Sequence, residues 1–198
     1  NCISGFYTPT NGSVVLQGES IAGLGSHAVA RKGVVRTFQN VRLFKRMTVL
    51  ENLLVAQHQK ARVNVLAGLF NTASFRRQEA EAIERSLHWL DYMGLREFAN
   101  REAGNLAYGH QRRLEIARCM ITDPKVLMLD EPAAGLNPQE KIDLQNLIRQ
   151  LRDQYGVAIL LIEHDMDAVF QLADRITVLV YGKVFAQGSS EQIQNDPR

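Results

Sequence analysis

The sequence has little of what marks secreted, membrane-spanning or strongly charged proteins. Its 198 residues include two cysteines, Cys2 and Cys119, which form no disulfide framework and no metal motif and so favour a reducing compartment. No apolar run approaches the roughly 20 residues that a membrane-spanning helix needs, and no signal peptide is visible at the start. A net charge of +2 does not require a polyanionic partner. With 45% apolar and 22% charged residues, the composition is that of an ordinary globular protein.

The clearest signal is an apolar run, residues 126–129, followed by Asp130, Glu131 and Pro132. Four apolar residues in a row fit a strand buried on both faces of a parallel sheet. Ligands bind at the carboxyl ends of such strands, and two acids there are costly unless they meet a cation or a proton to be moved. A Walker-B element has this form, with Asp for Mg²⁺ and Glu for a water. The alternative is a buried strand with an incidental acidic end.

Two more strands are predicted to end beside polar side chains. Residues 34–39 are rich in β-formers and deliver Gln39 to a loop, and residues 157–162 form a second buried apolar run before His164. Helices alternate with the strands, which predicts a parallel core with right-handed crossovers. Taken alone, Gln39 fits a loop amide equally well, and His164 fits a strand-end histidine satisfied by backbone groups.

The middle of the chain, residues 48–120, has no convincing strand and is predicted to be a helical insert. Its first helix begins with a capping box formed by Thr48 and Glu51. Around its start, six Lys or Arg and no acid occur between residues 20 and 50. This basic stretch is interpreted as a solvated face, a site for an anionic ligand or a docking surface.

These motifs follow one another in a specific order. A Gln follows a strand, a helical insert comes next, and then come Leu-x-x-Gly-x-Gln, Leu-Asp-Glu-Pro, Gly-Leu-Asn-Pro and a strand that ends in His. This order resembles the ATP-binding subunit of ABC transporters over nearly the whole chain. Three stretches are most similar to bacterial branched-chain amino-acid importer ATPases: residues 36–39, 51–56 and 106–118.

The resemblance implies an α/β fold, that of a P-loop NTPase of the ABC ATPase type. Such a fold has a parallel core sheet, an inserted helical subdomain and here a partial antiparallel β subdomain. On this basis residues 1–198 form one ABC ATPase domain fragment. We expect residues 1–41 and 121–198 to form the RecA-like core with a remnant of the β subdomain, and residues 42–120 to form the helical subdomain.

The resemblance also implies roles at the carboxyl edge of the sheet. Asp130 would hold Mg²⁺ directly or through water, and Gln39 would ligate Mg²⁺ and contact the attacking water. Glu131 would be the base that orients this water. His164 would contact the γ-phosphate and the water, since an imidazole can donate to phosphate while a neighbour fixes its other nitrogen. The implied catalytic residues are Glu131, His164 and Gln39, and the implied metal ligands are Asp130 and Gln39.

Two implied nucleotide-binding segments depart from the family pattern. The signature, commonly Leu-Ser-Gly-Gly-Gln, has Ala107 in place of the Ser whose hydroxyl would touch a γ-phosphate. The helix N-terminus still offers N–H groups to phosphate, although a helix start without a ligand is the alternative. The D-loop, usually Ser-Ala-Gly-Leu-Asp, has Ala133 and Asn137 in place of its Ser and Asp. The residues assigned to nucleotide binding are Ala107, Tyr108, Gly109, His110, Gln111, Gly135, Leu136 and Asn137.

One family motif, the phosphate loop Gly-x-x-x-x-Gly-Lys-Ser/Thr, does not occur in this sequence. In the family it lies just upstream of the point where this chain begins, and residues 1–5 resemble the end of the helix that follows it. We therefore expect an N-terminally truncated ABC ATPase. We expect the fragment alone to bind ATP poorly and to be inactive, because it lacks the amides and the Lys that cradle the β- and γ-phosphates.

The implied function is an ATP-hydrolysing subunit that energises an ABC importer, with ATP and Mg²⁺ as ligands and branched-chain amino acids as cargo. The implied partners are a second ATPase subunit, identical or different, the transmembrane permease subunits and, indirectly, a periplasmic or extracellular binding protein, with no nucleic acid. The implied location is peripheral, on the cytoplasmic face of the inner or plasma membrane. The alternatives are a non-transport ABC ATPase that acts on nucleic acid or ribosomes, and a catalytically incomplete fragment.

Overall fold

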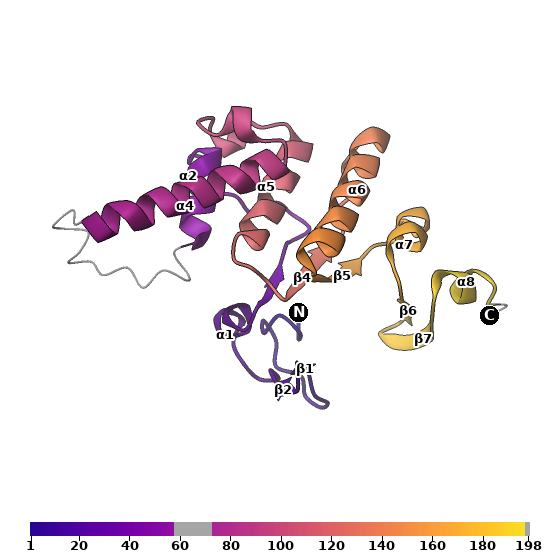
Figure 1. Ribbon diagram of the computed structural model, residues 1–198. Coiled ribbons are helices and arrows are strands. Elements are labelled where there is room, and N and C mark those ends of the chain that lie inside the picture. Colours follow the sequence, from indigo (N-terminus) through magenta and orange to yellow (C-terminus); the bar gives the residue numbers. More distant parts are fainter. Residues whose placement is uncertain (58–72, 197–198) are drawn as a thin grey trace.

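A parallel sheet lies at the centre of the computed structural model, which describes residues 1–57 and 73–196. Its strands are β3 (Val34–Arg36), β4 (Val126–Asp130) and β5 (Ala158–Ile162), in the order β3-β4-β5. Both pairings are parallel, so the three strands end at the same edge of the sheet (Figure 1).

Helices and two antiparallel strand pairs surround this sheet. In chain order they are β1 (Val15–Leu16), β2 (Glu19–Ser20), α1 (Ser26–Arg31), α2 (Val49–Gln57), α4 (Ala73–Tyr92), η1 (Arg96–Phe98), η2 (Ala103–Asn105), α5 (Tyr108–Met120), α6 (Pro138–Tyr155), α7 (Met166–Leu172), β6 (Ile176–Val180), β7 (Lys183–Gly188) and α8 (Ser190–Gln194). Strand β1 pairs with β2, and β6 pairs with β7. In the described ranges, none of the helices combines the length and the apolar character needed to cross a membrane.

Strand β4 is buried on both faces, as its unbroken apolar run predicts. Leu127 and Leu129 are fully buried in the large core that includes side chains of α5 and α6. Met128 belongs to a second, smaller cluster with Val29 of α1 and Val34 of β3. Because successive side chains of a strand point to opposite faces, the two clusters hold β4 from both sides.

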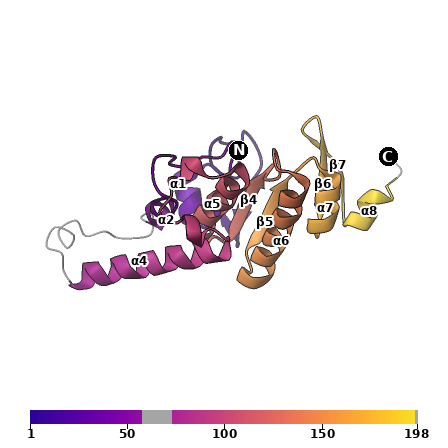
Figure 2. The same cartoon turned by 90° about the horizontal axis from the view of Figure 1, so that it is seen from above.

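Strand β5 is not buried, contrary to the prediction from its apolar sequence. Its side chains alternate between exposed and half-buried, and Leu160 and Ile162 are 39% and 46% exposed. Within the described residues β5 pairs with β4 along one edge only, and Figure 2 shows the β6–β7 pair standing apart from it. An apolar run cannot show whether a strand lies inside a sheet or at its edge, because that depends on its neighbours.

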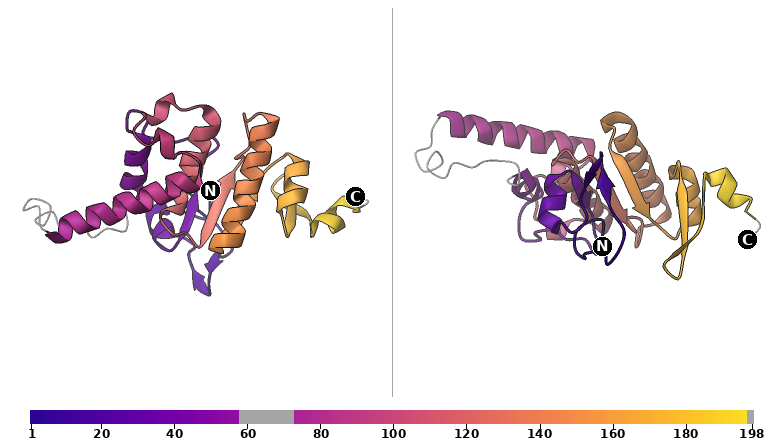
Figure 3. Two further views of the ribbon diagram at one scale, coloured as in Figure 1. Left: turned by 45° about the horizontal axis from the view of Figure 1, so that its top comes forward. Right: turned by 90° about the horizontal axis from the view of Figure 1, so that it is seen from below.

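Helices α2, α4 and α5 form the predicted helical insert between β3 and β4. Leu53, Leu90 and Leu114 are fully buried where these helices pack, and their core continues into that of the sheet. The capping box at the start of α2 is confirmed: the N–H of Glu51 donates to Thr48 Oγ1 (3.1 Å), and the N–H of Thr48 donates to Glu51 Oε2 (2.7 Å). Figures 2 and 3 show α4 extending away from the sheet.

Helix α6 covers the sheet beside β4 and β5 and begins with a second capping box (Figure 3). The N–H of Glu140 donates to Asn137 Oδ1 (2.9 Å), and the N–H of Asn137 donates to Glu140 Oε2 (3.0 Å). Pro138 occupies the first helical position, where no N–H is needed. The helix ends at Gly156, whose φ of 63° suits glycine. Its buried side chains are Leu144, Leu147, Ile148 and Leu151.

Both cysteines are free thiols, in line with the absence of a disulfide pattern. Cys2 is exposed, whereas Cys119 lies in the last turn of α5. Burial raises the pKa of Cys119 to about 12, because a thiolate there would lose its hydration, and the nearby carboxylate of Glu115 adds to the effect.

Loss of the α6 cap tests how this helix begins. We expect Asn137→Ala to lower the free energy of unfolding by about 0.5–2 kcal/mol, because the N–H of Glu140 loses its acceptor. Urea unfolding followed by circular dichroism measures this change. The control is Asn146→Ala, at an exposed position in the middle of the same helix, where Ala is favoured and no loss of stability is expected. Equal destabilisation by both substitutions would argue against the cap.

Alkylation of the thiols tests the partial burial and the raised pKa of Cys119. At pH 8, far below a pKa of about 12, about one Cys119 in 10⁴ is a thiolate, which is the reactive form. At pH 8 we expect iodoacetamide to label Cys2 readily in the folded protein and Cys119 much more slowly than after denaturation, as mass spectrometry of the digested protein would show. Because the thiolate fraction rises as the pH approaches the pKa, labelling of Cys119 should accelerate between pH 8 and pH 10. Equal labelling rates for the two thiols at pH 8 would contradict the burial.

Candidate functional site

The carboxyl ends of the parallel strands bring polar side chains together at one edge of the sheet. Gln39 follows β3, Glu131 follows β4 and His164 follows β5. The Nε2 of Gln39 donates to Glu131 Oε2 at 3.0 Å, and the Nδ1 of His164 lies 3.9 Å from Glu131 Oε1. Of the three side chains that the motifs single out for catalysis, Gln39 and His164 therefore approach the carboxylate of the third, Glu131.

Glu131 leaves the sheet through a strained turn. Its φ of 43° lies in the left-handed region, which residues other than glycine rarely adopt. Its N–H still donates to the carbonyl of Ile162 on β5 at 2.9 Å, so the turn begins where β4 is still paired. The loop that follows is held by Glu163, whose Oε1 accepts the N–H of Ala133 at 3.1 Å. The strain is thus supported by contacts with the end of β5.

The residue before it, Asp130, forms an ion pair with Arg36 of β3. The Nη2 of Arg36 lies 2.5 Å from Asp130 Oδ2, and the two side chains are 11% and 23% exposed. The Nη1 of Arg36 donates to Asn1 Oδ1 at 2.6 Å and to Ser4 Oγ at 3.3 Å. Arg36 therefore connects the end of β4 to the first residues of the chain, and it does not belong to a solvated basic face.

Arg36 and Glu163 belong to this edge although the motifs do not include them. For Arg36 the sequence holds a signal, since a guanidinium inside an apolar, β-rich run needs an opposite charge once the strand is buried. For Glu163 no comparable signal exists. Its contact with Ala133 depends on where the loop after β4 lies, which the sequence does not determine.

Oxygen ligands for Mg²⁺ at this edge are few but of the right kind. Within residues 1–57 and 73–196, no group of three or more His, Cys, Asp or Glu could hold a metal ion. Mg²⁺ in nucleotide sites is usually held by one or two carboxylates, with substrate phosphates and waters as the other ligands. The carboxylate of Asp130 and the amide oxygen of Gln39 fit that role. The contact with Arg36 occupies Oδ2 of Asp130, so a metal ion there would bind the other carboxylate oxygen or displace Arg36.

The start of α5, where the signature residues lie, faces the beginning of α6. Ala107 is the N-cap residue, and no side-chain hydrogen bond caps the helix. Gly109 is buried against α6, and a Cβ at Gly109 would lie 2.7 Å from Glu140 Oε1. A larger residue at this position would therefore require the carboxylate of Glu140 to move. The first N–H groups of α5 are therefore left without a capping side chain.

The next two signature residues turn back toward the helical insert. The ring of His110 stacks on Phe98, with 5.0 Å between the centroids. The Nε2 of Gln111 donates to the carbonyl of Leu106 at 2.9 Å. The side chains of His110 and Gln111 are therefore engaged in contacts within residues 42–120. Of the predicted signature, only Ala107, Tyr108 and Gly109 remain at the start of α5, beside α6.

The D-loop residues lie beside the signature residue Tyr108. Gly135 has a φ of 79°, and a Cβ there would lie 3.2 Å from Tyr108 Cε1. Leu136 is 9% exposed and joins the large core, while Asn137 caps α6. The D-loop and the start of α5 therefore form one continuous surface.

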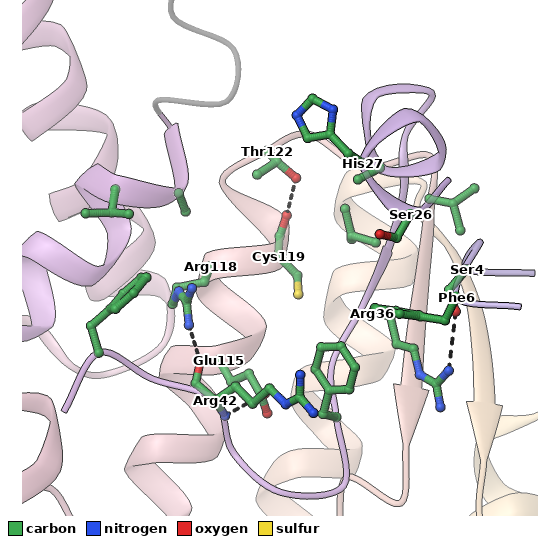
Figure 4. A pocket seen from close by; sticks show the side chains of 17 residues that line it. Ser4, Phe6, Ser26, His27, Arg36, Arg42, Glu115, Arg118, Cys119 and Thr122 are labelled. Carbon is green, nitrogen blue, oxygen red and sulfur yellow. Dashed lines mark hydrogen bonds between the residues drawn. The ribbon is translucent and has the colours of Figure 1, made fainter. Parts of the chain in front are cut away.

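A cavity of about 500 Å³ separates α1 and β3 from α2 and α5 (Figure 4). Its lining combines aromatic rings with guanidinium groups: Phe6, Phe38, Phe44, Arg36, Arg42 and Arg118. Arg42 lies 4.1 Å from the centroid of the Phe38 ring, and Arg118 lies 5.1 Å from that of Phe44. The Nη1 of Arg118 donates to the carbonyl of Arg42, and burial lowers the pKa of Arg118. Two of the six basic residues of the stretch between residues 20 and 50, Arg36 and Arg42, therefore line the cavity.

Comparison with known proteins gives a consistent result. The family model described as "ABC transporter" matches residues 1–134. The chain is 61% identical over 197 residues to the high-affinity branched-chain amino acid transport ATP-binding protein BraF of Pseudomonas aeruginosa, over 100% of this chain and 77% of that protein. It is 56% identical over 197 residues to LivG of Escherichia coli K12, a protein of the same description, with the same coverage.

Solved structures agree with this assignment. The fold is similar to that of MJ1267 in its ADP conformation, an ATP-binding cassette of an ABC transporter, with a TM-score of 0.81 and 30% identity. That match covers 100% of this chain and 78% of the other. A nucleotide-free ATP-binding cassette gives a TM-score of 0.80 at 30% identity, with the same coverage. The chain therefore belongs to the ABC transporter family, as one of its nucleotide-binding ATPase subunits.

Proposed function

We propose that this subunit hydrolyses ATP at the edge formed by Gln39, Glu131 and His164 and thereby powers an importer of branched-chain amino acids. The observation that carries the proposal is the convergence of these side chains on one carboxylate beside Asp130. The cargo is inferred from relatives, since BraF and LivG are both described as branched-chain amino acid transport proteins.

Glu131 is suited to orient the hydrolytic water and accept its proton. One of its oxygens accepts the Nε2 of Gln39, and the other faces the Nδ1 of His164. A carboxylate held between a neutral amide and an imidazole stays available as an acceptor for water. The side chain of His164 is 76% exposed, so its ring can reach a phosphate placed outside the sheet.

Asp130 and the amide oxygen of Gln39 would hold Mg²⁺, which supplies charge neutralisation on the phosphates when bound. Arg36 fixes the carboxylate of Asp130 through Oδ2. Gln39 thus serves two purposes, because its nitrogen holds Glu131 while its oxygen remains a ligand.

A second ATPase subunit completes the site in this proposal. The start of α5 offers N–H groups with no capping side chain and the positive end of the helix dipole, which suit a phosphate. Gly135 and Asn137 are exposed on the same surface. ATP would therefore lie between the strand edge of one subunit and the α5 start of the other, and the D-loops would lie next to it.

The cavity in Figure 4 is the proposed contact with the membrane-embedded permease subunits. Its rings and guanidinium groups suit an amphipathic segment with an acidic side chain. Phe38 and Arg42, on either side of Gln39, form part of its wall. A segment bound there would touch both the sheet and residues 42–120, which we propose move as a helical subdomain. This arrangement would hold the protein peripherally at the cytoplasmic face of the membrane.

Glutamine in place of Glu131 tests the base assignment. In the assembled transporter we expect Glu131→Gln to reduce the ATPase kcat by about 10²–10⁴-fold, because the amide cannot accept the proton. ATP affinity, measured by titration with a fluorescent analogue, should change less than about threefold, since Glu131 is proposed to act on the attacking water and not to hold the phosphates. Glu97→Gln, at an exposed position in η1, is the control and should have no effect. Normal turnover in Glu131→Gln would remove Glu131 from this role.

The cargo is tested on the assembled transporter. In proteoliposomes with the matching binding protein, we expect leucine, isoleucine or valine to stimulate ATP hydrolysis and to be taken up. Histidine and glutamate are the controls and should do neither. Stimulation by a control amino acid alone would show that the cargo is different while leaving the ATPase assignment intact.

A further inference from the structure

Arg112 on α5 is fully buried, and the chemistry proposed above makes no use of it. Its Nη1 donates to the carbonyl of Phe38 at 2.7 Å, and its Nη2 donates to the carbonyl of Gln39 at 2.8 Å. One guanidinium therefore binds two successive carbonyls in the loop that carries Gln39. The planar fork of arginine suits such a pair of acceptors, whereas the single ammonium of lysine does not.

The charge of Arg112 is balanced by Glu115, one turn further along α5. The Nη1 of Arg112 donates to Glu115 Oε2 at 2.9 Å, and the two side chains are 0% and 5% exposed. The other oxygen of Glu115 accepts the N–H of Arg42 at 3.1 Å. Burial raises the pKa of Glu115, while the N–H of Arg42 and the charge of Arg112 oppose this. The two charges thus balance each other while the pair binds the loop at three backbone groups, although Arg112 Nε has no hydrogen-bond partner among the described residues.

Tyr108, one turn before Arg112, extends this connection to the D-loop. Its hydroxyl oxygen accepts the Nη2 of Arg112 at 3.3 Å. Its ring packs on Gly135, where an added Cβ would come within 3.2 Å of Cε1. Arg112 thus touches the backbone of Gln39, Tyr108 touches the loop at Gly135, and the two side chains touch each other.

This placement has a consequence for Gln39. Its carbonyl is held by α5, whereas its side chain donates to Glu131, at the end of β4, at 3.0 Å. A small displacement of α5 relative to the sheet would move the backbone of Gln39 and break the contact with Glu131. A hydrogen bond of this kind weakens steeply when its length or angle changes.

We propose that Arg112 and Tyr108 are positioning residues, which bring Gln39 to Glu131 only while the start of α5 is seated on the loop at Gly135. This inference rests on the proposed roles of Gln39 and Glu131. It makes the catalytic contact conditional on the surface that would bind the second subunit. Hydrolysis would then depend on the state of the D-loop without any direct contact between that loop and the water.

The test compares Arg112→Lys, Tyr108→Phe and the double variant in the assembled transporter. A misplacement of about 1 Å can cost about 10²-fold in rate, so we expect Arg112→Lys to lower kcat by about 10–100-fold. The KM for ATP should stay within about threefold. Tyr108→Phe, which loses only the hydroxyl, should lower kcat by about 2–10-fold. The double variant should be no slower than Arg112→Lys alone, because both substitutions break one connection.

The control is Arg113→Lys on the same helix. The guanidinium of Arg113 faces Met93 and Asp143, at 3.4 and 3.5 Å, and not the Gln39 loop, so normal kinetics are expected. A purely structural role would instead lower the melting temperature without a selective loss of kcat, and that result would overturn the inference. If Arg112→Lys fails to fold, Tyr108→Phe decides, since an unchanged kcat there would also overturn it.

The outcomes separate this inference from the proposed function. Normal turnover of Arg112→Lys and Tyr108→Phe, alongside inactive Glu131→Gln, would reject the connection and keep the ATPase site. Normal turnover of Glu131→Gln would instead reject the role of Glu131 itself. Multiplicative losses in the double variant would show that Arg112 and Tyr108 act independently and would reject a shared connection.

Discussion

Val126 pairs with Val34 on one side and with Ala158 on the other, and this parallel register decides where the three central strands end. Asp130 and Ile162, the last residues of β4 and β5, are partners in this register. The residues that follow these strands therefore lie at the same edge of the sheet. Leu127 and Leu129 anchor β4 in the large core, and Met128 anchors it on the opposite face. The polar groups at this edge therefore rest on a strand that cannot shift without opening both clusters, and this keeps Gln39, Glu131 and His164 within reach of one another.

Two arginines, the fully buried Arg112 and the mostly buried Arg36, carry the next level of organisation. Arg36 joins β3 to Asp130, and Arg112 joins α5 to the loop after β3. A buried guanidinium is costly unless it has an opposite charge and several acceptors, so each of these side chains fixes the segments it binds. Both connect parts of the chain that are distant in sequence and adjacent at the site. The same residue type thus supplies rigidity to the sheet edge and a connection from that edge to the helices.

Much of this organisation follows from the sequence, and the part that does not has a common cause. The apolar run before Asp130 predicts β4 correctly, and the pairs Thr48–Glu51 and Asn137–Pro138 are local signals that mark where helices begin. These features depend on neighbours in the sequence. A pattern in neighbouring residues cannot predict a contact between segments that are distant in the sequence and adjacent in the fold.

Three features depend on such contacts between distant segments: the exposure of β5, the ion pair of Arg36 and the buried contacts of Arg112. The apolar sequence of β5 suits either the inside or the edge of a sheet, and the structure places it at the edge within the described residues. Arg36 looks like one more cation of a basic stretch until β3 lies beside β4. Arg112 looks like an ordinary polar residue of a helix until the Gln39 loop packs on α5.

The departures from the family pattern at the start of α5 fit together physically. A Ser at the position of Ala107 would offer a hydroxyl to phosphate, and as an N-cap residue it would also accept one of the first N–H groups of the helix. Ala107 does neither, so the phosphate binding proposed there would rest on backbone N–H groups alone. Tyr108 stands where the common pattern has glycine, and its ring and hydroxyl reach Gly135 and Arg112. The helix start therefore has an aromatic contact where the common pattern has a hydroxyl. Under the proposed function, its position relative to the D-loop would matter more, because its own side chains would offer the phosphate less.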